Sequence, residues 1–102
     1  MKLLTKEIIA KLPKLYSQEK VADPICCLKY FTPDGGFTWY VVEGEKQADG
    51  DWLFFGKVVS GMCPDGELGY TMLSQIEEVR GSLGLPVERD RWFDPKPLSQ
   101  CK

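Results

Sequence analysis

The chain of 102 residues contains no histidine, and its four cysteines, Cys26, Cys27, Cys63 and Cys101, form no C-x-x-C pair. The usual Cys/His spacings of a zinc site are therefore missing, and so is the most common general acid and base of enzymes. Cys63, in a loop rich in glycine and proline, is the one conceivable nucleophile, and no base is evident beside it. The sequence therefore predicts a protein that is not an enzyme and that uses no metal or cofactor.

Long hydrophobic runs and a strong charge of either sign are also missing. No apolar stretch approaches the roughly 18 residues that a membrane-spanning helix needs, and Lys6, Glu7 and Lys11 interrupt the apolar start that a secretory signal would require. The 13 basic and 15 acidic side chains leave a net charge of −2. This balance argues against direct binding of nucleic acid, because nucleic-acid binders normally carry a basic face. We expect a reduced, cytoplasmic protein without membrane contact.

The composition is that of one globular domain over residues 1–102, with 43% hydrophobic and 27% charged side chains. Two apolar runs, residues 37–45 and 52–59, are rich in the aromatic and β-branched residues that pack well in strands. The Asp49-Gly50 pair between them favours positive φ and therefore a tight turn. We predict an antiparallel hairpin at the centre of one sheet.

Strict alternation places Trp39 and Val41 on one face of this hairpin and Tyr40 and Val42 on the other. Both faces are therefore apolar. Such a sheet is either covered on both sides or offers one side to a partner.

Two short helices are expected to flank the sheet. Thr5 can cap the first, over residues 6–12, and Pro13 ends it. Ser74 begins a Ser-x-x-Glu capping box and is expected to cap the second helix. Gly81 is expected to end that helix, because a left-handed residue is easiest at glycine.

Residues 25–31 and 67–73 are the two remaining strands, and residues 32–36 carry a strong turn signal between strands. Residues 82–102 hold prolines at positions 86, 95 and 97 and are expected to form an extended arm. Short connections make neighbouring strands antiparallel. The predicted fold is α+β, a four-stranded antiparallel meander sheet with two short helices and an extended C-terminal arm.

The ends of the central hairpin carry acidic side chains that could meet a basic protein surface, with aromatic residues as buried anchors. The same acids are also typical of solvated turns, and they lack the regular spacing of a calcium loop. Core packing is the better account of the aromatic residues, and an exposed aromatic patch is the alternative. The candidate partner-binding residues are Glu43, Glu45, Asp49, Asp51, Trp52, Trp39 and Tyr40.

A second candidate site is the polar run Glu88, Arg89, Asp90 and Arg91. One of its arginines could clamp a carboxylate or phosphate, with an aromatic residue of the sheet stacking on a base. The alternative is a solvated segment, or an arginine that ties the arm to the sheet through ion pairs.

Short motifs of apolar, aromatic and turn residues are spread over nearly the whole chain. They are Leu4-Thr5, Leu12-Pro13, Asp23-Pro24, Lys29-Tyr30-Phe31-Thr32-Pro33, Thr38-Trp39-Tyr40, Glu43-Gly44, Phe54-Phe55-Gly56, Glu67-Leu68-Gly69-Tyr70, Leu83-Gly84-Leu85-Pro86, Glu88-Arg89-Asp90 and Phe93. In this order they resemble a bacterial family of small domains of unknown function. The resemblance implies a mobile-element cargo, because members of that family are typically carried by plasmids, integrative elements and phages, often near antirestriction and conjugation genes. The family supplies no established catalytic residue that could be carried over.

Small size, acidic loops, missing catalytic groups and this resemblance together predict a non-catalytic accessory protein of a mobile element. We expect it to bind and inhibit a bacterial defence or nucleic-acid-processing protein, in the manner of an anti-restriction or anti-CRISPR protein. The acidic loops would then meet the basic channel of a nuclease. The alternative is a small-molecule or nucleotide-binding domain that uses Arg89 or Arg91 together with aromatic residues of the sheet.

Overall fold

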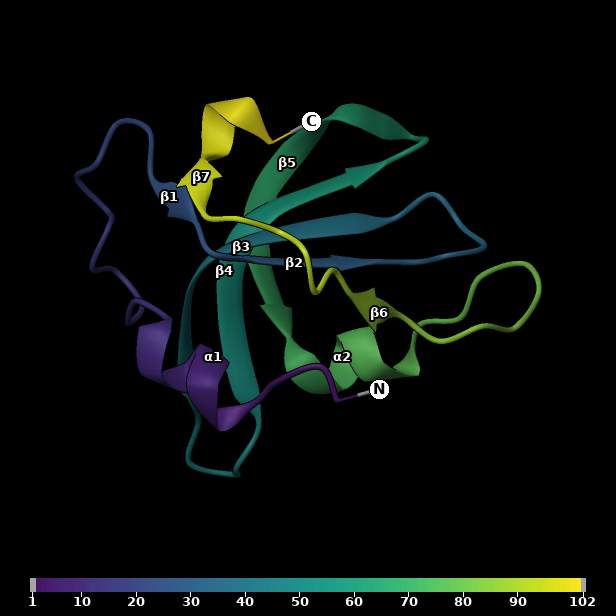
Figure 1. Cartoon of the computed structure of the whole chain (residues 1–102), viewed down its shortest axis with the longest axis horizontal. Coiled ribbons are helices and arrows are strands. Elements are labelled where there is room, and N and C mark those ends of the chain that lie inside the picture. Colours follow the sequence, from purple (N-terminus) through teal and green to yellow (C-terminus); the bar gives the residue numbers. More distant parts are fainter. Residues whose placement is uncertain (1, 102) are drawn as a thin grey trace.

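A computed structural model describes residues 2–101 and consists of short elements around one antiparallel sheet (Figure 1). In chain order the elements are α1 (Lys6–Lys11), β1 (Ile25–Cys26), β2 (Leu28–Phe31), β3 (Thr38–Lys46), β4 (Trp52–Ser60), β5 (Cys63–Met72), α2 (Leu73–Glu78), β6 (Glu88–Arg89), β7 (Lys96–Pro97) and the 3-10 helix η1 (Leu98–Gln100). The five-stranded sheet has the order β5-β4-β3-β2-β6, and β1 pairs with β7 in a second, two-stranded sheet. The α+β class is confirmed, and so is the meander from β2 to β5.

The predicted central hairpin is confirmed. β3 and β4 pair from Thr38 opposite Val59 to Lys46 opposite Trp52. At the turn Gly50 takes a φ of 90°, a conformation that a residue without a side chain adopts easily.

The two faces of the sheet carry separate cores, as the alternation predicts. On the first face, Trp39, Val41 and Phe54 pack with residues of the N-terminal segment and with Ile76 of α2. On the second face, Tyr40 and Val42 pack beneath β1 and the C-terminal arm, with Cys26, Leu98 and Cys101. Each face is therefore covered, although the cover of the second face does not extend over all of β4 and β5.

The expected single strand over residues 25–31 is wrong, because the chain changes partner at Cys27. Ile25 and Cys26 pair with β7, whereas Leu28 begins the pairing with β3. β7 of the C-terminal arm pairs with β1, so β1 belongs to the two-stranded sheet and not to the main sheet. The expected count of four strands is also wrong, since β6 of the same arm pairs with β2.

The fourth strand begins earlier than predicted. Ser60 already pairs with Cys63, so most of the expected loop over residues 60–66 belongs to the β4–β5 hairpin. The register shifts between Val58 and Ser60, and Gly66 takes a φ of 82°. The turn residues from which a loop is predicted therefore lie within an irregular part of the hairpin.

The first helix is confirmed, with its cap. The N–H of Ile8 donates to the Thr5 hydroxyl oxygen at 3.3 Å. None of the helices that the structure describes is long and apolar enough to cross a membrane.

The expected limits of the second helix are wrong. Met72 is its N-cap, and the Gln75 side chain accepts the hydrogen bond from the Met72 N–H at 2.9 Å. The Ser74 hydroxyl instead donates to Asp51 at 2.5 Å. The helix ends at Glu78, well before Gly81.

Gly81 serves close packing rather than helix termination. A Cβ at this position would lie 1.8 Å from the Asp34 Oδ1. The other carboxylate oxygen of Asp34 accepts hydrogen bonds from the N–H groups of Leu83 and Leu85 at 2.7 and 3.1 Å. The turn before β3 therefore holds the loop after α2.

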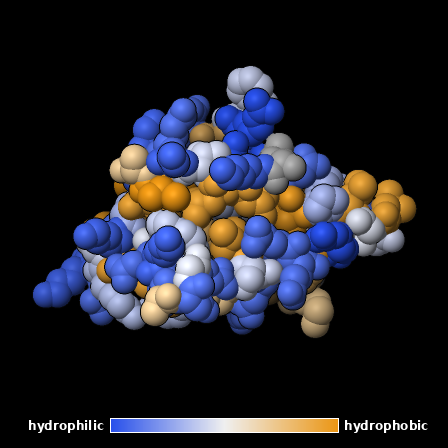
Figure 2. All heavy atoms as spheres, turned by 90° about the horizontal axis from the view of Figure 1, so that it is seen from below, coloured by the Kyte–Doolittle hydropathy of each residue, from blue (hydrophilic) through white to orange (hydrophobic). Residues whose placement is uncertain are grey.

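Apolar side chains also reach the surface. Seen from below, they form a band between polar borders (Figure 2). The most exposed large apolar side chains in the described part of the chain are Met62, Trp92 and Leu83, at 97%, 88% and 79%.

Candidate functional site

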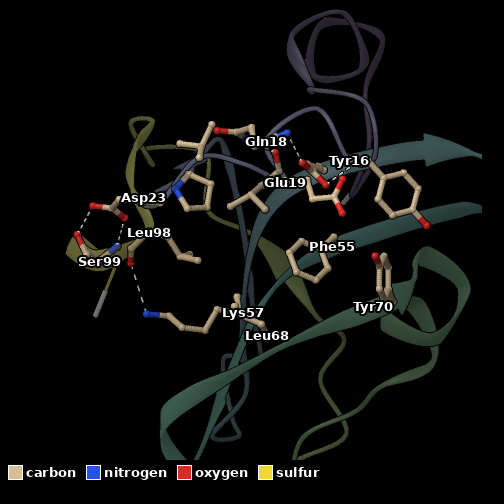
Figure 3. A pocket seen from close by; sticks show the side chains of 15 residues that line it. Tyr16, Gln18, Glu19, Asp23, Phe55, Lys57, Leu68, Tyr70, Leu98 and Ser99 are labelled. Carbon is tan, nitrogen blue, oxygen red and sulfur yellow. Dashed lines mark hydrogen bonds between the residues drawn. The ribbon is translucent and has the colours of Figure 1, made fainter.

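A groove of about 550 Å³ opens on the second face, beside the part of the sheet that the arm leaves uncovered (Figure 3). Its volume lies within the roughly 300–1,000 Å³ that is usual for ligand sites. Strands β3, β4 and β5 form the floor, and the loop of residues 14–24 and η1 form the walls. Its lining residues are Tyr16, Gln18, Glu19, Val21, Ala22, Asp23, Pro24, Val42, Glu43, Phe55, Lys57, Leu68, Tyr70, Leu98 and Ser99.

A bulge in β3 brings a carboxylate into this groove. Val41 pairs with Gly56 and Glu43 pairs with Phe55, so Val42 is an additional residue opposite β4. Paired residues of antiparallel strands share a face, which places Glu43 on the second face with Phe55. Without the bulge, strict alternation would turn Glu43 towards the core of the first face.

The Glu43 carboxylate holds the loop that forms one wall. Its side chain is 3% exposed, and its two oxygens accept hydrogen bonds from the N–H groups of Tyr16 at 2.9 Å and Gln18 at 2.6 Å. Hydrogen bonds to a charged acceptor are stronger than neutral ones. They stabilise Tyr16 at a φ of 69°, which is uncommon for a residue with a side chain.

Gln18 ties the same loop to two strands. Its Nε2 donates to the carbonyl oxygens of Val42 at 3.0 Å and Ile25 at 3.2 Å, and its Oε1 accepts from the Ile25 N–H at 2.8 Å. All of its side-chain polar atoms are thus occupied by backbone groups. The loop is held from both β1 and β3.

The opposite wall is also fixed by polar contacts. Asp23 accepts hydrogen bonds from the Ser99 hydroxyl at 2.6 Å and the Ser99 N–H at 3.0 Å, and these bonds lower the pKa of Asp23. Lys57 Nζ donates to the carbonyl oxygens of Cys101 at 2.9 Å and Leu98 at 3.4 Å. The charged groups at this end are therefore bonded within the protein.

Two tyrosines meet at the rim of the groove. Tyr16 comes from the loop and Tyr70 from β5, and their side chains point toward one another (Figure 3). A hydrogen bond with Tyr16 raises the pKa of Tyr70. Both residues are more than half exposed, at 61% and 52%, as is Leu68 at 61%. Together with Phe55 these side chains form an apolar area that is open to contact.

The structure does not gather the predicted partner-binding residues on one surface. Trp39 and Tyr40 are 7% and 4% exposed and belong to opposite cores. Trp52 packs against the core of the first face. Of the predicted set, Glu43 lines the groove. A binding role for the buried members stays a prediction. Each of them could contact a partner only if the segments that cover it moved.

The remaining members lie at the β3–β4 turn. Glu45 and Asp49 are exposed, and Asp49 accepts a hydrogen bond from the Asp51 N–H at 3.0 Å. Asp51 accepts from the Ser74 hydroxyl and N–H, and the hydroxyl contact lowers its pKa. Asp51 therefore joins the turn to α2, while the other two acids remain accessible.

The second predicted site is brought together more closely. Glu88, Arg89, Asp90 and Arg91 line a surface hollow of about 430 Å³. The guanidinium of Arg89 donates to the Lys2 carbonyl oxygen, so this arginine ties the arm to the N-terminal segment.

Sequence reasoning missed two neighbours of this hollow. Lys29 lies 3.7 Å from the Asp90 carboxylate, and Trp92 is 88% exposed. Phe31 of β2 is the aromatic residue of the sheet that lines this hollow, and Trp92 is a second aromatic residue there. Its position one residue after Arg91 was the available signal.

Within residues 2–101, no three Cys, Asp or Glu side chains lie together in a group that could hold a metal ion. All four cysteines are free thiols. Burial raises the pKa of Cys27 to about 11, which disfavours its reactive thiolate.

No curated protein and no solved structure matches this chain. A family described as "Protein of unknown function (DUF2958)" matches residues 3–101. The match includes both candidate sites and all of the strands and helices described above. The chain belongs to the DUF2958 family.

Proposed function

We propose that this chain is a non-catalytic protein that binds another protein through the groove. The observation that carries the proposal is an apolar floor that stays open while the charged groups of Glu43, Asp23 and Lys57 are bonded internally. Exposed tyrosine and leucine side chains above a concave apolar surface are typical of binding sites. Because the walls are held by backbone contacts, the groove is formed before a partner arrives.

The charge of the lining favours a basic partner. It contains three carboxylates, Glu19, Asp23 and Glu43, and one ammonium group, Lys57. Proteins that process nucleic acids carry basic channels, so a bacterial defence protein or nuclease supplies a suitable surface. The resemblance to domains carried by mobile elements supports an inhibitory, anti-restriction or anti-CRISPR role.

The test uses a groove variant with a matched surface control. Leu68→Asp places a charge on the apolar floor, at a side chain that is 61% exposed, and Leu83→Asp makes the same change at a side chain that is 79% exposed and lies outside the groove. Purified restriction and CRISPR nucleases are assayed for DNA cleavage with increasing amounts of each protein. We expect inhibition by the wild type and by Leu83→Asp, and about tenfold weaker inhibition by Leu68→Asp. Equal inhibition by both variants would exclude the groove, and no inhibition of any nuclease would count against the proposed target class.

A second candidate function is nucleotide binding at the hollow around Arg91. The observation that favours it is the exposed Trp92 indole beside the cations Arg91 and Lys29, which suits a planar base that bears a phosphate. Nucleotides should then quench tryptophan fluorescence and raise the melting temperature. Trp92→Ala should abolish both effects, and Trp52→Phe, at a partly buried tryptophan, is the control. Unchanged melting with every nucleotide would remove this candidate.

A further inference from the structure

The outer edge of β5 adjoins the groove and has no strand beside it. β5 has ten residues and stands at the end of the five-stranded sheet, and no other strand of the described chain pairs with its far side. The opposite end of the sheet is closed by β6, which has only two residues. Unpaired N–H and C=O groups along a strand of this length form a template for another strand.

The half of β5 nearest the groove lacks the usual protection of an edge. Natural edge strands are guarded by lysine, proline or a bulge. From Glu67 opposite Val58 to Met72 opposite Leu53 the pairing with β4 is regular, and this stretch contains neither lysine nor proline. The irregularity of the hairpin is confined to its other end, near Ser60.

The two faces of this stretch differ in chemistry. Leu68 and Tyr70 lie opposite Lys57 and Phe55 and line the groove. On the other face lie Glu67, which is exposed, and Gly69, which is partly buried and where a Cβ would meet nothing within 4 Å. A strand added here would therefore place alternate side chains beside the apolar floor and the rest beside Glu67.

We infer that the groove and the β5 edge together bind an extended segment of a partner protein, which joins the five-stranded sheet as a further strand. Its side chains alternate between apolar residues, which lie beside Leu68 and Tyr70, and Lys or Arg residues, which lie beside Glu67. A second copy of this chain lacks that chemistry, because β5 contains no basic residue. This inference rests on the proposed function and names the form of its ligand.

The first experiment selects the ligand without assuming its sequence. Random peptides of about nine residues, roughly the length of a long strand, are displayed on phage and selected on the wild-type protein. We expect enriched sequences with alternating apolar and basic residues. Helical spacing of the apolar residues, or no enrichment over Leu68→Asp protein, would overturn the inference.

The second experiment separates strand pairing from side-chain contact. The best peptide is synthesised in an unmodified form and in two N-methylated forms, one methylated at the odd-numbered amides and the other at the even-numbered amides. Each methyl group removes a hydrogen-bond donor and leaves both the side chains and the protein unchanged. In one of the two methylation patterns binding should weaken at least about tenfold. Full affinity for both methylated peptides would overturn strand addition while leaving the groove as a binding site, so this failure is distinct from failure of the nuclease assay.

Two variants complete the test. Glu67→Lys should reverse the preference of the site from basic to acidic peptides, because its side chain lies beside alternate positions of the added strand. Leu83→Asp should bind peptide as the wild type does. Sedimentation that shows a dimer abolished by Leu68→Asp would assign the edge to a second copy of the chain and overturn the inference.

Discussion

The first face of the sheet is closed by apolar side chains, whereas the second is closed largely by hydrogen-bonded segments of chain. On the first face Tyr30 and Ile76 are fully buried, and helices and the N-terminal segment cover them. On the second face Glu43, Gln18 and Lys57 hold the loop and the arm by polar contacts. Apolar packing stabilises the whole domain, while polar ties keep a wall in place and leave an apolar floor accessible. The larger apolar core therefore lies on the first face, and the accessible groove lies on the second.

Truncation of the first-face core should have the largest effect. Phe54 is 2% exposed and contacts Tyr30 with ring centroids 5.9 Å apart. Phe54→Ala should lower the free energy of unfolding by about 3–5 kcal/mol, because it removes buried area and leaves a cavity. Urea unfolding followed by fluorescence measures the change. Phe37→Ala, at a ring that is 45% exposed, is the control. A loss below that of the control would show that the buried core of the first face is not the main source of stability.

Removal of the buried carboxylate should have the next largest effect. Glu43→Ala leaves the N–H groups of Tyr16 and Gln18 without their acceptor, and we expect a loss of about 2–4 kcal/mol. Hydrogen exchange of these two amides should accelerate more than that of amides in the first-face core. Glu45→Ala removes an exposed carboxylate of the same strand and should change stability by less than about 0.5 kcal/mol. Equal acceleration of exchange at all amides would show that Glu43 stabilises the whole domain and not this loop in particular.

A buried hydroxyl of the first face should make stability sensitive to alkali. The Tyr30 hydroxyl donates to the Leu3 carbonyl oxygen at 2.6 Å, and burial raises the pKa of Tyr30 above its ordinary value. The unfolded tyrosine ionises near pH 10, roughly its ordinary pKa, so stability is full below that pH and falls above it. Tyr30→Phe should lose about 1 kcal/mol at neutral pH and show a shallower fall between about pH 9 and 11. An equally steep fall in the variant would assign the alkaline effect to other groups.

The smallest effect concerns the polar wall of the second face. Hydrogen bonds with Ser99 lower the pKa of Asp23 below its ordinary value. This contribution to stability is present above the ordinary pKa of about 3.9 and is lost as pH falls through the lower folded value. Asp23→Asn should therefore be slightly less stable at neutral pH and should lose less on acidification. Asp49→Asn, at an exposed turn, is the control, and identical acid profiles for the two variants would leave Asp23 without a role in the wall.

The fold was predictable where the signal was local. The alternation around Trp39 and Tyr40 predicts both faces of the hairpin, and the Asp-Gly pair predicts its turn. Thr5 predicts the cap of the first helix. The division between β1 and β2 was not predictable, because it depends on pairing with residues of the distant arm. Ser74 shows the same limit, since a tertiary contact with Asp51 takes the hydroxyl that would cap a helix.

The candidate groove was harder to predict than the fold. The sequence predicts a role for Glu43 in binding, but its contact with the loop depends on hydrogen bonds across 27 and 25 positions of the chain. The bulge that turns Glu43 into the groove has no marker in the run Val41-Val42-Glu43. The hollow around Arg89 was easier, because four of its residues are consecutive in the sequence. The mobile-element context, the cytoplasmic location and the partner stay predictions.

The bulge at Val42 also has a consequence for how this strand can change in evolution. A regular strand must choose between a valine for the core of the second face and an acid for the loop, because only one residue stands opposite Phe55. With the bulge both side chains lie on that face, and the Val42 carbonyl oxygen accepts a hydrogen bond from Gln18. A one-codon insertion at this point would add a carboxylate that holds the loop without reorienting any downstream residue, since Gly44 and its successors keep their partners on β4. Insertion or loss of one residue at this position therefore leaves the pairing of the following residues with β4 unchanged.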